Sequence, residues 1–83
     1  MSRLSELPNV GKVLESNLQR IGVETPEQLQ EMGSKEAFLR IRLHDCGACL
    51  HMLYGLQGAV EGIRDTQLNQ DTKEDLKRFF NGL

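Results

Sequence analysis

The chain has 83 residues, a formal net charge of −2 and 39% hydrophobic residues, with one Tyr, three Phe and no Trp. This length suits one domain, residues 1–83, with a modest aliphatic core. The slight acidic excess differs from the basic excess of a dedicated nucleic-acid-binding domain. No apolar run approaches the ~20 residues that span a bilayer, and the N-terminus lacks the apolar segment of a secretory signal. We therefore expect a soluble, cytoplasmic protein with no membrane partner.

Helix signals begin at the N-terminus. Ser2 is placed to cap a short first helix, which ends at Pro8 because the residue before a proline avoids helical angles. The turn over residues 8–11 then leads into a second helix over about 11–21. Gly22 follows it and is expected to stop it in the left-handed conformation.

Two further helices follow with only a short break between them. Residues 25–28, Thr-Pro-Glu-Gln, predict a capping box with proline at the first helical position, and this third helix ends at Gly33. Ser34 is expected to cap a fourth helix that extends to about residue 43. Apolar residues at helical spacing are expected to face the core: Leu29, Met32, Ala37, Phe38 and Ile41.

The C-terminal half predicts a longer fifth helix over about 48–63 and a last helix that begins near residues 71–74. No stretch alternates apolar and polar residues for long enough to indicate a strand. The fold class is therefore all-α: a compact bundle of five to six short helices, of the helix-hairpin-helix or SAM-domain-like kind.

Glycines recur on one side of the fifth predicted helix. Gly55, Gly58 and Gly62 stand at i, i+3 and i+7. Each glycine inside a helix costs about 1 kcal/mol relative to alanine, so three on one side indicate that another helix packs unusually close there. With Pro8 and Gly22 at the earlier turns, these glycines are the predicted structural residues.

Two segments carry a family resemblance: LPNVGKVLESNLQRIGVETPEQL, residues 7–29, and LHMLYGLQGAVEGIR, residues 50–64. Together they resemble the C-terminal domain of the TfoX (Sxy) competence regulators, and the similarity runs from about Leu4 to Phe80. The resemblance implies a helical, helix-hairpin-helix-like domain of proteins that regulate natural DNA uptake. In those regulators an α/β domain precedes the helical one. Since Met1 stands just before the first predicted helix, we expect this chain to lack it.

The turn at residues 7–12 is the first candidate site. Hairpins of this type commonly have L-P-G-I-G, whose glycines let backbone N–H groups approach a phosphate at a helix N-terminus. Asn9 takes the first glycine position here and tolerates left-handed angles better than most residues. The candidate phosphate- or DNA-binding residues are Asn9, Val10, Gly11, Lys12 and Arg20.

The alternative for this turn is purely structural: Pro8 and Gly11 shape a corner between helices and Lys12 is solvated. The charge of the following segment favours this alternative, because an acidic flank repels a nucleic-acid backbone. The acidic residues of that flank are Glu24, Glu27, Glu31 and Glu36.

The second candidate is HDCGACLH, with His44, Cys46, Cys49 and His51 as possible zinc ligands. Zinc needs its ligands to converge tetrahedrally. His51 lies about 200° around a helix from Cys49, so one helix cannot present all four. We therefore predict no metal and no other cofactor, and expect Cys46 and Cys49 to be small buried apolar residues.

No Ser-His-acid combination or phosphate-binding loop stands out, so we predict no catalytic activity. Two functions remain. The first, which the charge favours, is a regulatory protein-interaction module that docks on another protein or on a second copy of itself. The second is a DNA-binding domain that contacts phosphates through the hairpin over residues 7–12.

Overall fold

Helices make up all the regular structure that the computed structural model describes, over residues 3–45 and 47–83. The predicted all-α fold is confirmed for this part of the chain. In chain order the elements are the 3-10 helix η1 (Leu4–Glu6), α1 (Lys12–Arg20), α2 (Pro26–Met32), α3 (Ser34–Arg42), α4 (Leu50–Glu61), the 3-10 helix η2 (Asp65–Gln67) and α5 (Gln70–Asn81).

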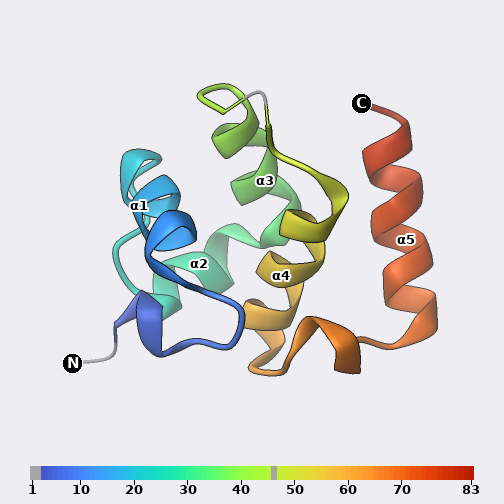
Figure 1. The fold of residues 1–83 in the computed structure, drawn as a ribbon, viewed down its shortest axis with the longest axis horizontal. Coiled ribbons are helices and arrows are strands. Elements are labelled where there is room, and N and C mark those ends of the chain that lie inside the picture. The colour runs from blue at the N-terminus through green and yellow to red at the C-terminus, as the bar shows by residue number, and fades with distance from the viewer. Residues whose placement is uncertain (1–2, 46) are drawn as a thin grey trace.

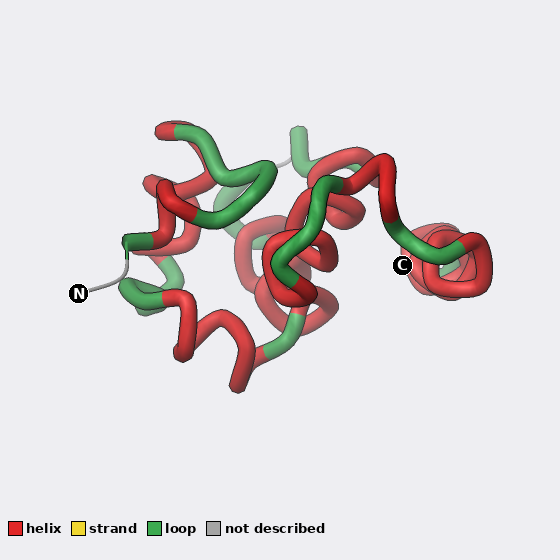
Figure 2. Tube along the Cα trace, turned by 90° about the horizontal axis from the view of Figure 1, so that it is seen from below, coloured by secondary structure: helices red, strands yellow, loops and turns green. Residues whose placement is uncertain are grey.

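Helix α4 is the centre of the bundle. It contacts α2, α3, α5 and η2, while α1 packs on η1 and α3. Figure 1 shows α4 between α3 and α5, with α1 and α2 to one side. In the perpendicular view of Figure 2, α5 lies at one edge of the molecule. The overall dimensions are 33 × 26 × 20 Å.

The core collects aliphatic side chains from every α-helix, as their spacing predicts. Phe38 is the largest fully buried side chain, and its ring lies 5.9 Å from that of Phe80, which ties α5 to α3. The other large, fully buried side chains are Leu4, Leu18, Val23, Leu29, Ile41, Leu53, Leu56 and Leu76.

Two local signals between α1 and α2 are confirmed: the glycine that follows α1 and the capping box that begins α2. Gly22 has φ +89°, in the left-handed region that glycine enters without cost. The capping box of α2 is complete: the Gln28 N–H donates to Thr25 Oγ1 at 3.2 Å, and the Thr25 N–H donates to Gln28 Oε1 at 3.3 Å. The end of α1 and the start of α2 are therefore determined by nearby residues.

The predicted cap at Ser34 is wrong. Ser34 is the first residue of α3, and Gly33 occupies the N-cap position. The Ser34 side chain is buried and its hydroxyl donates to Gln57 Oε1 of α4. Helix α5 likewise begins one residue earlier than predicted, because the Asn69 side chain accepts a hydrogen bond from the Asp71 N–H. The predicted cap at Ser2 lies outside the described residues.

The prediction of three glycines inside one helix needs correction. Helix α4 is shorter than predicted, and Gly62 ends it with φ +77°. Gly55 and Gly58 are inside the helix and buried, but the atoms nearest to a Cβ at either glycine belong to Asn9 and to residues 63–65 after α4, not to another α-helix. A Cβ at Gly58 would lie 2.5 Å from Asn9 Nδ2 and 2.7 Å from the Ile63 carbonyl oxygen. The glycines therefore make room for the turn that leads into α1, residues 7–12, which we call the hairpin, and for the turn after α4.

No described helix combines the length and the apolar character that crossing a membrane requires.

Candidate functional site: the groove beside the hairpin

Asn9 attaches the hairpin to the C-terminal end of α4. Its backbone adopts φ 69°, the left-handed conformation predicted for this position. Its Nδ2 donates to the carbonyl oxygens of Ile63, at 3.0 Å, and Gly55, at 3.4 Å. Its Oδ1 accepts from the Asp65 N–H at 3.1 Å. A primary amide both donates and accepts, so this one side chain satisfies backbone groups of both kinds.

The next residues of the hairpin have different environments. Val10 is 6% exposed, belongs to the core, and donates its N–H to the Leu7 carbonyl oxygen at 3.3 Å. Gly11 is the N-cap of α1 and Lys12 its first residue, and both are exposed. The first N–H groups of a helix have no intrahelical acceptor, so this helix end presents partial positive charge to its surroundings.

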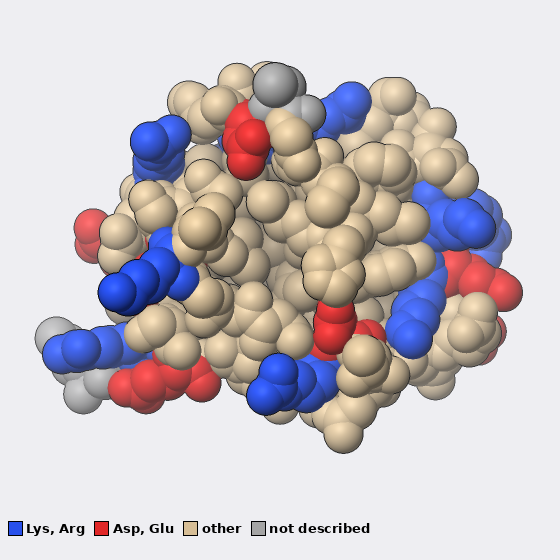
Figure 3. Space-filling model, viewed as in Figure 1, with Lys and Arg blue, Asp and Glu red and all other residues tan. Residues whose placement is uncertain are grey.

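A groove of about 620 Å³ runs beside this helix end, with its lining drawn from segments 9–14, 51–55 and 64–66. We call it the hairpin groove. Its apolar lining comes from Val13 and Leu14 of α1 and Met52 of α4. Val13 is 76% exposed although it is a large apolar residue. Figure 3 shows the face that carries α1 and α4: a broad area without charged side chains, bordered by Lys and Arg side chains on several sides and by Asp or Glu side chains above and below it.

Four titratable residues line the hairpin groove. Lys12 comes from α1 and Arg64 from the turn after α4, and among the described residues neither forms an ion pair. His51 Nε2 lies 3.6 Å from Asp65 Oδ2, with side chains 83% and 18% exposed respectively. Asp65 supplies the carboxylate among these lining residues, and its side chain is only partly exposed to solvent.

The hairpin groove brings together Asn9, Gly11 and Lys12 of the predicted site residues. Val10 is buried, and Arg20 lies in the last turn of α1, outside the groove lining. The contributions of α4 and of segment 64–66 were missed, because no local pattern links them to a hairpin some 50 residues earlier in the sequence. The local signal for these distant contacts is Asn9, which replaces the first glycine of the common hairpin sequence.

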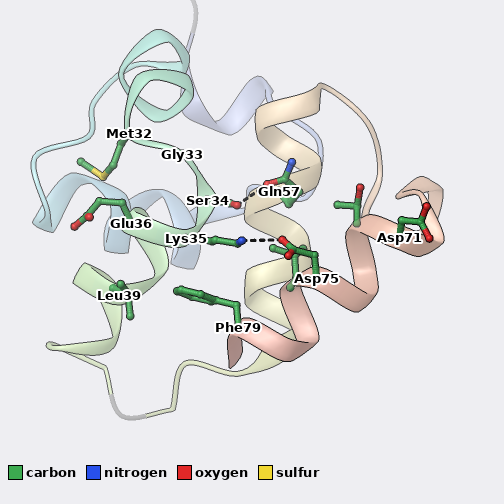
Figure 4. A pocket seen from close by; sticks show the side chains of 12 residues that line it. Met32, Gly33, Ser34, Lys35, Glu36, Leu39, Gln57, Asp71, Asp75 and Phe79 are labelled. Carbon is green, nitrogen blue, oxygen red and sulfur yellow. Dashed lines mark hydrogen bonds and ion pairs between the residues drawn. The ribbon is translucent and has the colours of Figure 1, made fainter. Parts of the chain in front are cut away.

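A second pocket, of about 810 Å³, lies between α3 and α5 (Figure 4). Lys35 Nζ pairs with Asp75 Oδ2 at 2.7 Å across it and lies 5.4 Å from the centre of the Phe79 ring. The hydrogen bond from Lys35, and then its charge, lower the pKa of the Asp75 carboxyl. Lys35 pairs with Asp75, and Ser34 pairs with Gln57. These contacts join α3 to α5 and to α4, so helix packing explains the presence of these polar groups.

The histidine and cysteine segment does not form a metal site within the part of the chain that is described. No group of three or more His, Cys, Asp or Glu side chains there is arranged to hold an ion. Cys49 is the N-cap of α4 and exposed, so the prediction that it is buried is wrong. Cys46 lies outside the described residues. His44 and His51 are both exposed.

The TfoX C-terminal domain family matches residues 1–80. The chain is 30% identical over 81 residues to Protein Sxy of Escherichia coli (strain K12), covering 98% of this chain and 39% of that protein. It is 28% identical over 81 residues to the DNA transformation protein TfoX of Haemophilus influenzae, covering 98% of this chain and 37% of that protein. The chain thus spans less than two-fifths of the length of these two relatives.

Two crystal structures of proteins from Listeria monocytogenes are similar over almost the entire chain. A triclinic form of an uncharacterized protein has a TM-score of 0.96 and 51% identity, covering 98% of this chain and 92% of that one. A tetragonal form of a protein of unknown function has a TM-score of 0.93 and 52% identity, covering 95% of this chain and 96% of that one.

Proposed function

Because the chain belongs to the TfoX C-terminal domain family, we propose that it is a cytoplasmic regulatory domain that acts by binding another protein in the hairpin groove. One of its relatives is a DNA transformation protein by name, and we extend a role in controlling DNA uptake to this chain. The observation that carries the proposal is the exposed Val13, which lines the groove together with Leu14 and Met52.

The environment of the hairpin favours a protein partner over a nucleic acid. A hairpin that grips phosphates commonly needs a glycine where this chain has Asn9, and free N–H groups beyond it. The Asn9 side chain and the Val10 N–H are both engaged in intramolecular hydrogen bonds. A groove whose lining includes the exposed Val13 and the half-buried Met52 instead suits an apolar side chain of a protein partner.

A matched pair of variants tests the proposal by affinity capture from the native host. Val13→Asp places a charge at the groove, whereas Leu43→Asp makes the same kind of change at a residue that is 85% exposed and outside the groove lining. Asp is favourable in the first turn of a helix, so Val13→Asp is expected to fold. We expect to capture a partner with the wild type and with Leu43→Asp but not with Val13→Asp. The same partner, once purified, should bind the wild-type chain directly. The same partners with all three proteins would contradict the proposal.

A second candidate function, DNA binding, has one specific observation in its favour. Lys12, the first residue of α1, and Arg64 line the same groove, and neither has an ion-pair partner among the described residues. Two cations and a helix N-terminus suit a phosphate group. Such binding would fall steeply with salt, and Lys12→Glu would abolish it. If duplex DNA does not bind at low salt with protein at about 100 µM, this candidate is excluded, since the dissociation constants of non-specific DNA binding are about 100 µM or lower.

A further inference from the structure

We infer that the occupant of the hairpin groove is an acidic peptide segment that inserts an apolar side chain between α1 and α4. The inference rests on the proposed function, since it specifies the chemistry of the partner for the same groove. Apolar contact, local charge and the shape of the groove each support it.

One of the lining residues from α4 is a glycine, Gly55, which contributes no side chain to the groove. Gly55 is buried, and the atom nearest to a Cβ built there is Asn9 Cβ of the hairpin, at 3.5 Å. Val13 and Leu14 form the apolar wall on the α1 side. An apolar side chain placed between these walls would remove both its own surface and that of Val13 from water, which is favourable.

The charge in the groove has the opposite sign to that of the whole chain. The chain carries a net charge of −2, but Lys12 and Arg64 enter the groove from two different segments. The positive end of α1 adds to their potential. Glu15, the acidic residue of α1, accepts a hydrogen bond from the Ser5 N–H and is not part of the groove lining.

The remaining titratable groups of the groove, Asp65 and His51, leave this balance in place. The Asp65 side chain is 18% exposed and its carboxylate lies against His51, so its negative charge is less accessible than the two cations. Protonation of His51 would only add positive charge. Potentials of opposite sign guide a partner to the groove and select against basic competitors.

A nucleic acid would satisfy the cations but has little to place against Val13, Leu14 and Met52. A second copy of this chain is also acidic, and its docking would produce a dimer. The acidic peptide segment matches both the cations and the apolar walls. Grooves that bind peptides commonly recognise apolar side chains and charge together.

The test uses the complete chain and three fluorescein-labelled synthetic peptides. In the first, Leu and Phe are flanked by Asp and Glu; in the second, Lys replaces the acidic residues; in the third, Ser replaces Leu and Phe. Fluorescence anisotropy should show the first peptide binding at least about tenfold more tightly than the other two, and binding should weaken as salt rises. Equal binding of the first two peptides, or no binding of the first, would overturn the inference.

Charge-reversal variants locate the binding. The double variant Lys12→Glu with Arg64→Glu should weaken the first peptide at least about tenfold, while Arg42→Glu with Lys77→Glu, the same charge change outside the groove lining, should leave it unchanged. All four side chains are exposed, and thermal melting checks that both variants fold. Equal loss in the two double variants would also overturn the inference.

The outcomes separate the inference from the proposed function. If a captured partner depends on Val13 but the acidic peptide does not bind, the partner chemistry is wrong and the groove remains a protein site. If the acidic peptide binds the wild type and Val13→Asp equally, its site is elsewhere and the inference fails. If duplex DNA binds and the acidic peptide does not, the occupant is a nucleic acid. If the acidic peptide does not bind and the chain forms a dimer that Val13→Asp abolishes, the occupant is a second copy of the chain.

Discussion

Asn9 Nδ2 donates a hydrogen bond of 3.0 Å to the carbonyl oxygen of Ile63, which lies 54 residues further along the chain. The same side chain accepts a hydrogen bond from the Asp65 N–H. Asn9 thereby joins the hairpin that begins α1 to the turn that follows α4. These are two of the three segments that line the hairpin groove, so one amide holds the hairpin in place beside the segment that contains Arg64.

Loss of the Asn9 amide should be costly for the whole fold. Asn9→Gly keeps the left-handed backbone conformation but leaves the partly buried Ile63 oxygen and Asp65 N–H without partners, at a cost of about 2 kcal/mol in the free energy of unfolding. Asn9→Ala adds backbone strain and should cost about 3 kcal/mol. Urea denaturation followed by circular dichroism measures both. Wild-type stability of Asn9→Gly would show that the three hydrogen bonds contribute nothing.

The two buried glycines of α4 should respond in opposite ways to alanine. A Cβ at Gly58 would lie 2.7 Å from the Ile63 oxygen, a backbone atom that cannot move aside cheaply, and we expect Gly58→Ala to destabilise by about 2–3 kcal/mol. A Cβ at Gly55 would lie 3.5 Å from Asn9 Cβ, an ordinary contact. Gly55→Ala should therefore be neutral or stabilise by up to about 1 kcal/mol through helix propensity. Thermal unfolding of the two variants side by side is the measurement, and equal midpoints would refute this account.

Features that depend on neighbouring residues were predictable from the sequence, and those that depend on distant ones were not. The capping box over residues 25–28 and the turn at Gly22 are complete within a few positions, so local patterns identify them. Ser34 has the local signature of a cap, but burial against Gln57, 23 residues away, takes precedence. The glycines of α4 indicated a close neighbour, but the prediction that this neighbour is another helix was wrong. That neighbour is the Asn9 side chain together with the turn after α4, which only the tertiary fold brings near.

Asp75 should titrate below its ordinary pKa. The hydrogen bond and the charge of Lys35 stabilise its carboxylate, so its folded-state pKa is lowered relative to the unfolded chain. The associated stability is present above the unfolded-state pKa and is lost as the pH falls through the folded-state pKa. An NMR titration of the Asp75 carboxyl carbon should show the depressed midpoint, and Lys35→Met should raise it. Since both side chains are exposed, added salt should also raise it. A midpoint that Lys35→Met leaves unchanged would assign the shift to another cause.

The protein should contain no stoichiometric zinc. Three or more converging donors are absent among the described residues, and structural zinc sites in proteins have four ligands. Elemental analysis of protein purified without chelators measures this directly, and unfolding midpoints with and without a chelator should coincide. Cys49 is exposed and should react with a thiol reagent in the folded state. One zinc ion per chain, lost together with the fold on chelation, would show that the segment over residues 44–51 binds metal.

Chemical-shift mapping by NMR locates the bound partner on the chain most directly. The partner that capture identifies is added to the ¹⁵N-labelled protein, and the backbone amide shifts are followed. Binding in the hairpin groove predicts shift changes centred on segments 11–14, 51–55 and 64–66, and none in Val13→Asp at the same concentration. Shift changes centred instead on α2 or on the exposed side of α5, retained in Val13→Asp, would contradict the account.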